Sequence, residues 1–510
     1  MNSTQPEESD SAADSKQKGT LHSTSFLALL GTQFLGAMND NMFRWFIIPI
    51  GKPLIGDAAA LSLGLACFTI PYLLLASVAG YLADRFSKRT VIVSCKVAEI
   101  VIMILGIWAI QLGNLNLLFF IVALMGCQSA LFGPAKFGSI PEMIRDNRLA
   151  KGNGLMGLIT VVSSALGFIA GNYLYHITQP NLKSPGSFSD ISIAAICLVG
   201  VAVLGTIISL KIRKLQPAAP DRGFPFNPVK ETWNQWQLLR SSTPLLRTAL
   251  GVAFFWMLAS MAQMNVDTYG IHELGLSQKD IGPLLGILVL GVAGGSILAG
   301  IWSAGRIELG IVPIGAAGIV VTSLLLFFTG SSIVPGTEAN SQTYYLLSLL
   351  WLFLLGVSSG LFDIPLETFL QHRSEVETRG SILAASNFLA FFFILIASGV
   401  FYVMQKHLEM SASQIFMVLG LLTIPVGIYI FKLLPNATIR AVVWMVSRTI
   451  YRLRVRGHEN LPKKGGALLV ANHVSWLDGV FLILTSSRPV RMVAFSTYVQ
   501  NPWIRWLTEL

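Results

Sequence analysis

Charged and amide side chains in the middle of one long apolar segment are the first candidates for chemistry in this sequence. The apolar residues between positions 25 and 50 are interrupted by Asn39, Asp40, Asn41 and Arg44. Asp40 and Arg44 are four residues apart, so on a helix they share one face and can form an ion pair. If this face lines a cavity, Asp40 can bind a substrate amine or a proton. If it does not, the pair fixes helix packing, and the sequence leaves both interpretations open.

Other apolar segments also contain polar groups, namely Glu99, Lys136, Gln263, Asn265, Asp267, Asp363 and Glu367. Charges at membrane depth are costly and usually functional. The ammonium group of Lys136, which follows Pro134, can either bind a lipid phosphate or anchor the end of its segment. A single sequence does not fix which face each helix presents to a cavity. The predicted substrate-binding residues are Asp40, Asn41, Arg44 and Lys136.

A second set of reactive side chains lies near the end of the chain, in residues 472–479. His473 can act as a general base, and Asp478 can hold its imidazole in the right tautomer and stabilise the charged form. The alternative is a histidine in a turn followed by a helix-capping aspartate. The four cysteines lie inside apolar segments without the spacing of metal ligands, so we expect neither a metal site nor a cofactor.

The elements that carry the first set are long apolar segments. Charged residues make up 12% of the 510 residues, and the mean hydropathy is +0.64. Too few polar residues are present to cover a soluble fold, and the apolar runs do not alternate as barrel strands do. Runs of about 20 apolar residues cross a membrane as helices. Twelve such spans are predicted at 25–50, 60–82, 91–112, 115–135, 152–178, 190–210, 246–270, 281–303, 309–330, 344–366, 380–403 and 413–434.

The connections between these spans divide by charge. Lys and Arg gather in the loops after the second, fourth, sixth, eighth and tenth spans and are few in the opposite loops. Basic loops stay in the cytoplasm, so we expect both termini there. The proline-containing segment 211–245 is predicted as a linker between two six-span halves. Residues 80–89 have a weaker echo at 300–306, which supports a parallel internal repeat.

Residues 80–89, Gly-Tyr-Leu-Ala-Asp-Arg-Phe-Ser-Lys-Arg, resemble the signature loop of the major facilitator superfamily, G-x-L-A-D-R-x-G-R-R, with Ser87 in place of one glycine. The resemblance implies an all-α polytopic fold of two six-helix halves. We expect Gly80 to allow close helix packing. Asp84, Arg85 and Arg89 are predicted to form a conformational latch with Gly80 at this loop. Simple anchoring of the basic residues is the alternative.

Two further segments resemble the bacterial lysophospholipid transporter branch of that superfamily. They are residues 34–41, Phe-Leu-Gly-Ala-Met-Asn-Asp-Asn, and residues 132–138, Phe-Gly-Pro-Ala-Lys-Phe-Gly. This resemblance implies a multi-pass protein of the bacterial inner membrane, with lysophospholipid as the substrate and membrane lipids as partners. No nucleic-acid partner is expected.

The residues after the last span change in character. Residues 437–450 mix apolar and basic side chains and predict an interfacial amphipathic helix. Residues 451–456 alternate as a strand does, and residues 467–471 predict a short buried strand. The set Asn472, His473, Ser475, Trp476, Asp478 and Gly479 then resembles the first motif, N-H-x-S-x-x-D, of the 1-acylglycerol-3-phosphate type of glycerolipid acyltransferase.

That resemblance implies an O-acyltransferase domain of α/β fold in which His473 takes the proton of the acceptor hydroxyl, with acyl-CoA or acyl carrier protein as the donor if the domain is complete. The family's later motifs, including a Glu-Gly-Thr-Arg-like phosphate site, do not follow Asp478. We therefore expect an incomplete domain, a fragment of a longer fusion or a truncated gene, and no transferase activity from these 510 residues alone.

The predicted organisation is a disordered tail (1–24), a first half (25–210), a cytoplasmic linker (211–245), a second half (246–434), and an amphipathic helix with an incomplete acyltransferase domain (435–510). The predicted function is lysophospholipid transport to the cytoplasmic leaflet linked to reacylation. The alternatives are a proton-coupled exporter of drugs or metabolites and a membrane-anchored acyltransferase.

Overall fold

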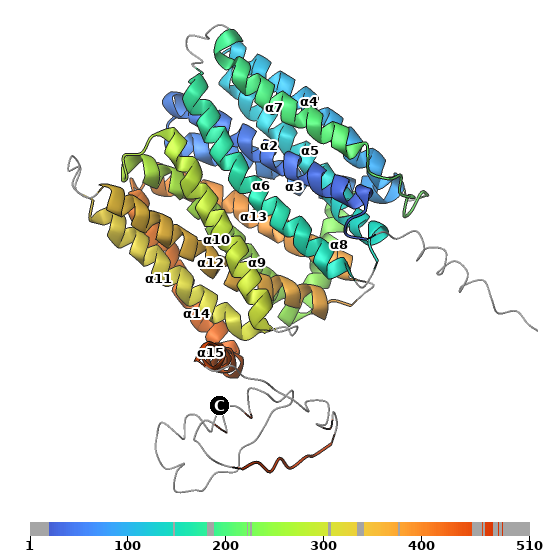
Figure 1. Ribbon diagram of the computed structural model, residues 1–510, viewed down its shortest axis with the longest axis vertical. Helices are drawn as coiled ribbons and strands as arrows, with labels where there is room; N and C mark the ends of the chain where they lie inside the picture. The colour runs from blue at the N-terminus through green and yellow to red at the C-terminus, as the bar shows by residue number, and fades with distance from the viewer. Residues whose placement is uncertain are drawn as a thin grey trace, which may run out of the picture.

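The computed structural model is a bundle of long helices (Figure 1). It describes residues 20–145, 148–180, 188–221, 223–224, 227–303, 308–333, 341–375, 378–450, 462, 465–472, 478 and 482. The long helices are α2 (Thr24–Ile55), α3 (Asp57–Arg85), α4 (Lys88–Gln111), α5 (Leu115–Met143), α6 (Leu149–Thr178), α7 (Phe188–Ser209), α9 (Thr243–His272), α10 (Gln278–Ser303), α11 (Val312–Ser331), α12 (Ser341–Arg373), α13 (Arg379–Lys406) and α14 (Ala412–Leu433). The shorter helices are α8 (Pro228–Ser241), the 3₁₀ helix η2 (Leu309–Ile311) and α15 (Pro435–Ile450).

Each of the twelve predicted spans falls on one of these long helices, which confirms the polytopic all-α prediction. Eleven helices of the described residues are long and apolar enough to cross a membrane. The remaining long helix is α2, whose mean hydropathy is lowered by the polar residues between Asn39 and Arg44. The first candidate site thus lies on the long helix whose apolar sequence is interrupted by these polar residues.

The packing of the helices repeats between the two halves. In the first half, α2 packs on α6, α5 packs on both α3 and α4, and α4 packs on α7. In the second half, α9 packs on α13, α12 packs on both α10 and α11, and α11 packs on α14. The halves meet where α6 packs on α10 and where α13 packs on α3 (Figure 1). Advancing every label by seven converts one set of pairs into the other, as a pseudo-two-fold arrangement requires.

Small residues allow the closest of these helix contacts. A Cβ atom added at Gly171 of α6 would lie 3.1 Å from the Cα atom of Met42 on α2. A Cβ atom at Gly282 of α10 would lie 2.6 Å from the Cα atom of Ile169 on α6. Because only glycine lets the backbones approach this closely, these two positions fix how α2, α6 and α10 fit together.

The segment predicted as a linker contains α8, a helix that we did not predict. Its start combines Asn227, whose side chain accepts a hydrogen bond from the backbone N–H of Lys230 at 2.9 Å, with Pro228 in the first turn. This is a standard helix start, although the prolines of this segment indicated an irregular chain. Trp236 and Leu239 of α8 pack into an apolar cluster with residues of α9 and α13, which include Leu245 and Leu389.

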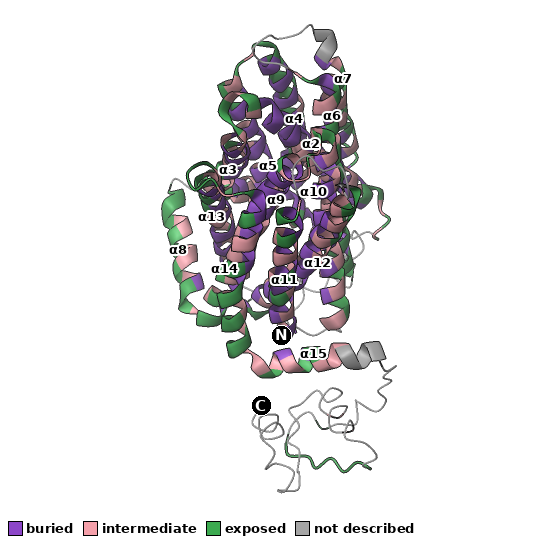
Figure 2. Cartoon of the chain, turned by 90° about the vertical axis from the view of Figure 1, so that its left-hand side faces the viewer, coloured by how far each residue is buried: buried purple, intermediate pink, exposed green. Residues whose placement is uncertain are grey.

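Each half is followed by a segment that rests on that half. After α7, the backbone N–H of Ala219 donates to the carbonyl of Asp84 at 2.9 Å, and the ring of Phe224 lies 5.2 Å from that of Tyr81. After α14, α15 lies across the end of the bundle (Figure 2). It is tied to the α10–α11 connection by an ion pair of 2.7 Å between Arg440 and Glu308. The predicted helix over 437–450 is therefore confirmed.

The prediction of a buried strand over 467–471 is wrong. These residues are neither helix nor strand, and Leu468 and Val470 are 85% and 87% exposed. A strand becomes buried only when neighbouring strands or a helix cover it, and the described part of the chain places no such element beside this segment. The predicted strand over 451–456 lies outside the described residues.

Candidate functional site

Asp40 lies in the middle of α2, where its carboxylate meets α5. Its Oδ2 atom accepts a hydrogen bond from the hydroxyl of Ser129 at 2.5 Å. Its Oδ1 atom is buried and has no hydrogen-bond partner among the residues that the structure describes. A buried polar atom without a partner costs free energy. Ser129 thus orients the carboxylate while one oxygen is left for a ligand.

Arg44, which was predicted to pair with Asp40, has a different hydrogen-bond partner. Its Nη2 atom donates to Oδ1 of Asn41 at 3.0 Å, and its guanidinium lies 5.2 Å from the ring centre of Phe68 on α3. Arg44 is still within electrostatic range of Asp40. Asn41 in turn donates to the hydroxyl of Ser164 on α6 at 3.1 Å. Asp40 and Asn41, which are adjacent in sequence, therefore connect α2 to α5 and to α6 respectively.

Lys136 of α5 supplies a second cation to the same region. It is 9% exposed and interacts electrostatically with Asp40. Its Nζ atom lies 4.4 Å from the ring centre of Phe137 and 5.7 Å from that of Phe132. Aromatic faces stabilise an ammonium group that has left water. Of the four predicted substrate-binding residues, Arg44 and Lys136 thus lie within electrostatic range of Asp40, whereas Asn41 is hydrogen-bonded to α6.

Tyr72 of α3 joins this polar cluster to the second half of the bundle. It lies within electrostatic range of Asp40 and Arg44. Its ring stacks on that of Phe391 on α13, with the centres 4.4 Å apart. No sequence pattern indicated Tyr72 or Ser129, because hydroxyl groups are common in membrane helices. We call Asp40, Arg44, Ser129, Tyr72 and Lys136 the central cluster.

A buried ion pair lies behind the central cluster in the first half. Lys96 and Glu99, three residues apart on α4, form an ion pair in which both side chains are 1% exposed. The Nδ2 atom of Asn39 donates to Oε1 of Glu99 at 2.8 Å. Glu99 was a candidate for the cavity wall, but here its two oxygens are occupied by side chains of its own half. The hydrogen bond from Asn39 to Glu99 therefore links α2 to α4.

The polar residues of the second half that were candidates for the cavity do not form a single cluster. The Nδ2 atom of Asn265 donates to the carbonyl of Ala412 at 2.8 Å and so ties α9 to α14. Asp363 and Glu367 interact electrostatically on α12, and Oδ1 of Asp363 is buried without a hydrogen-bond partner in the described chain. Asp267 belongs to a different site at one end of the bundle.

That site joins the two halves at the end of the bundle where α2 finishes and α10 begins. Lys52 of α2 pairs with Asp267 of α9, and their side chains are 10% and 0% exposed. The Nε2 atom of Gln278 donates to Oδ1 of Asp267 at 2.9 Å and to Oδ1 of Asn172 on α6 at 2.7 Å. We call these four residues the gate. The sequence did not predict it, because Lys52 was counted as a loop residue.

A second, more exposed pair lies at the same end. His272 of α9 and Asp57 of α3 approach to 2.5 Å, with side chains 57% and 25% exposed. Deeper in the bundle, the hydroxyl of Ser398 on α13 donates to the carbonyl of Ser62 on α3 at 2.7 Å. The two halves are therefore in polar contact at the gate end.

The signature loop lies at the other end of the bundle, and its contacts include residues of the first half and of the segment that follows it. Arg89 donates to the carbonyl of Leu210 at 2.9 Å, and the guanidinium of Arg85 lies 5.9 Å from the ring centre of Tyr81. The carbonyl of Asp84 accepts from Ala219. Close helix packing at Gly80 was the wrong expectation, because an added Cβ atom would meet no atom within 4 Å.

Comparison with known proteins agrees with the helical-bundle fold. A family profile described as Major Facilitator Superfamily matches residues 29–398. The chain belongs to the major facilitator superfamily. A solved structure of similar fold, a POT family transporter in complex with 5-aminolevulinic acid, superposes with a TM-score of 0.62 at 14% identity, over 83% of this chain and 98% of that one.

Curated relatives of this superfamily member are more similar in sequence. It is 26% identical to the lysophospholipid transporter LplT of Cronobacter sakazakii over 379 residues, which are 72% of this chain and 86% of that protein. It is also 26% identical to LplT of Pectobacterium carotovorum, over 72% of this chain and 83% of the relative.

A second profile, described as Acyltransferase, matches residues 452–510 of this superfamily member. The chain thus combines a transporter bundle with an acyltransferase-like segment. The predicted base His473 lies outside the described residues, whereas Asp478 lies within them as a partly buried residue. The arrangement of these two predicted catalytic residues therefore remains a prediction.

Proposed function

We propose that this protein carries lysophospholipid across the bacterial inner membrane to the cytoplasmic leaflet, and that its C-terminal segment belongs to a domain that reacylates the lipid. The relatives named as lysophospholipid transporters support the first part. The acyltransferase profile over residues 452–510 supports the second. Both activities act on the same class of lipid, which favours their combination in one chain.

The observation that carries the transport proposal is the presence of both charge signs in the central cluster. A zwitterionic lysophospholipid head group has a phosphate and an amine. Oδ1 of Asp40 is buried without a partner in the described chain and can accept a hydrogen bond from the amine. Arg44 and Lys136 both lie within electrostatic range of Asp40 and can bind the phosphate. The cluster therefore matches such a head group in charge.

The gate supports transport by alternating access. It holds the two halves together at one end of the bundle through Lys52 and Asp267. With the basic loops in the cytoplasm, this end faces away from the cytoplasm. The conformation is then closed on the outer side, and rocking of the halves has to break the gate before the central cluster can be reached from there.

Reacylation is the step that consumes the transported lipid. In this proposal His473 takes the proton of the free glycerol hydroxyl, which attacks the carbonyl carbon of an acyl thioester and releases the thiol. Asp478 orients the imidazole and stabilises its charged form. Tethering the carrier to the enzyme raises the local concentration of the acceptor lipid.

Uptake of labelled lysophosphatidylethanolamine into proteoliposomes tests the transport proposal. We expect Asp40→Asn and Ser129→Ala to reduce uptake by at least about tenfold, because each removes a charged or orienting contact to the head group. Asp280→Asn is the matched control, since this carboxylate lies in the first turn of α10, outside the central cluster. Equal uptake by wild type and Asp40→Asn would refute the proposal.

The same experiment separates the alternatives. Efflux of a small solute driven by a pH gradient, without lipid movement, would identify an exporter. Lipid remodelling that is insensitive to Asp40→Asn in cells would identify a bundle that only anchors the acyltransferase segment.

A further inference from the structure

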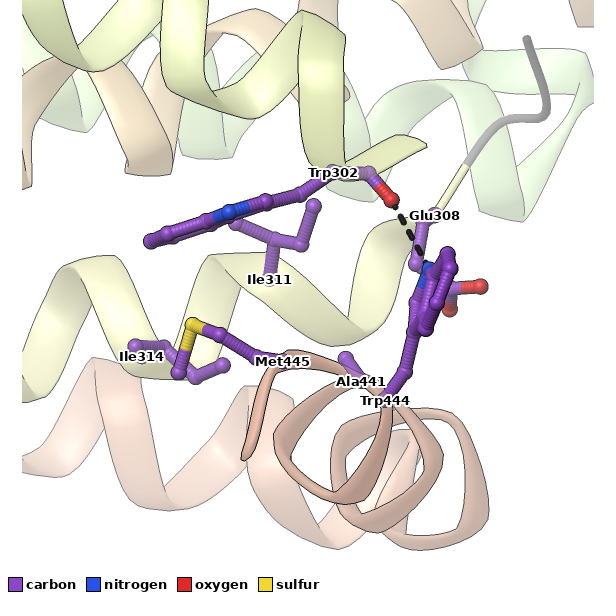
Figure 3. Close-up of a pocket in the computed structure, with 7 residues that line it drawn as sticks. All are labelled: Trp302, Glu308, Ile311, Ile314, Ala441, Trp444 and Met445. Atoms are coloured by element: carbon purple, nitrogen blue, oxygen red, sulfur yellow. Dashed lines mark hydrogen bonds between the residues drawn. The ribbon is translucent and has the colours of Figure 1, made fainter. Parts of the chain in front are cut away.

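The feature that carries a further inference is the contact between α15 and the end of the second half. The Nε1 atom of Trp444 donates to the carbonyl of Trp302 at 3.2 Å (Figure 3). On the other side of α15, Met445 lies against Ile314 (Figure 3). Together with the ion pair between Arg440 and Glu308, these contacts hold α15 in a fixed place across the bundle end.

A groove opens beside this contact. It has a volume of about 330 Å³, which is within the usual size of a ligand site. One side is formed by the last turn of α12, with Phe369, His372 and Arg373, and the other by Leu309, Glu308 and Arg440. Three basic side chains from two separate elements therefore converge on one groove that also has apolar walls.

The charges in this groove are not balanced. Glu308 is the acidic residue of the lining, and it is already paired with Arg440. Within the described residues, neither His372 nor Arg373 has an ion pair or a side-chain hydrogen bond, and both are exposed. Basic residues in the last turn of a helix interact favourably with its dipole. Arg440 faces the groove beside its partner Glu308, so the charge in the described lining that is left without a counter-ion is that of Arg373, with His372 next to it. The surplus of positive charge fits an anion.

The position of the groove indicates which anion. α15 lies across the bundle rather than along it (Figure 2), as an amphipathic helix does at the level of the lipid head groups. Phosphate groups of the bilayer lie at that level. The apolar side chains of Phe369 and Leu309 also line the groove. The groove thus offers both a charged and an apolar surface to one molecule.

We propose that this groove binds a glycerophospholipid of the bilayer, with its phosphate held by Arg373, His372 and Arg440 and its glycerol and first acyl carbons against Phe369 and Leu309. The site is separate from the central cluster and does not depend on transport. It holds a lipid at the point where the chain leaves the bundle towards the acyltransferase-like segment.

Native mass spectrometry of the full 510-residue chain in detergent tests this site, with dioleoylphosphatidylglycerol as the probe and inorganic phosphate in a parallel titration. The test variant is His372→Gln combined with Arg373→Gln, which leaves the ion pair between Arg440 and Glu308 in place. The control is Arg247→Gln, an exposed arginine near the start of α9 that is outside the groove. Thermal unfolding of each variant reports whether the fold is kept.

We expect the double variant to bind the lipid at least about tenfold more weakly than wild type and the control, because a charge-assisted contact to phosphate is lost. Inorganic phosphate should not compete at concentrations comparable to the lipid. Equal lipid binding by the double variant and wild type overturns the proposal. Binding of inorganic phosphate as tight as that of the lipid overturns the assignment to a lipid. Lysophospholipid uptake by the same samples tests the proposed function separately.

Discussion

The gate allows a quantitative prediction, because two carboxylates at the same end of the bundle differ in burial. Asp267 is fully buried against Lys52, whereas Asp57 is 25% exposed beside His272. Asp267→Asn leaves the ammonium of Lys52 buried without a counter-charge when the gate is closed. Losing one partner of a buried pair costs about 3 kcal/mol or more. In the open state Lys52 is hydrated, so this cost applies to the closed state.

A cost of about 3 kcal/mol shifts the ratio of closed to open molecules by about 150-fold. Asp57→Asn removes an exposed pair, which contributes at most about 1 kcal/mol and shifts the ratio by about fivefold. Spin labels at the exposed positions Ile55 and Lys279, one on each half, would report the distance across the gate after replacement of the native cysteines.

We expect Asp267→Asn to populate a longer distance that is minor in wild type, and Asp57→Asn to change the distribution little. Double electron–electron resonance on the two variants in nanodiscs measures this. If the two substitutions shift the distance distribution equally, or if Asp267→Asn leaves it unchanged, the assignment of the gate to the buried pair is refuted.

Three further predictions concern packing and protonation. Gly282→Ala should reduce lysophospholipid uptake severalfold, because the added Cβ atom would meet the backbone of α6 when the halves are closed. Gly300→Ala is the control on the same helix and should leave uptake unchanged, because the space around Gly300 is open. Glu99→Gln should lower the unfolding temperature by several degrees, because it leaves Lys96 buried and unpaired, with a loss of about 3 kcal/mol; an unchanged melting curve would contradict this. Burial raises the pKa of Glu273, which follows α9. A carboxyl group with a raised pKa in the folded state stabilises the fold at low pH. This contribution is lost as the pH rises through the folded pKa. As the pH rises above the ordinary glutamate pKa of about 4.3, the wild-type unfolding temperature should therefore fall relative to that of Glu273→Gln. Parallel curves would show that this carboxyl group is not involved.

The sequence predicted the helices well because apolar length is a strong signal. A run of about 20 apolar residues has few alternatives to a membrane helix, and the polar interruption at Asp40 marked the helix that carries the central cluster. Such a signal records the type of a side chain and its place along the chain. It singled out Asp40, Arg44 and Lys136, and the structure places the two basic residues within electrostatic range of Asp40.

The sequence pattern could not predict which side chains Asp40, Arg44 and Lys136 contact. Whether Arg44 contacts Asp40 or Asn41 depends on helix rotation and on the place of Phe68, which follow from the packing of α2 and α3. The gate was missed for the same reason, since Lys52 and Asp267 are more than two hundred residues apart and meet only when the halves close. α8 was missed because its prolines were given more weight than its helix-start residues.

The connection between the two halves has a mechanical consequence at the signature-loop end. Phe224 rests on Tyr81 of the first half, and Trp236 and Leu239 of α8 pack on the second half. Four peptide units lead from Phe224 to Pro228 and span at most about 14 Å. The eight residue steps of α8 from Pro228 to Trp236 add about 12 Å, so the two contacts can lie at most about 26 Å apart along this connection. While both contacts hold, the length of this connection sets an upper limit on how far the two halves can separate at the signature-loop end. A wider opening requires one of the two contacts to break. The connection therefore limits the range of motion between the halves.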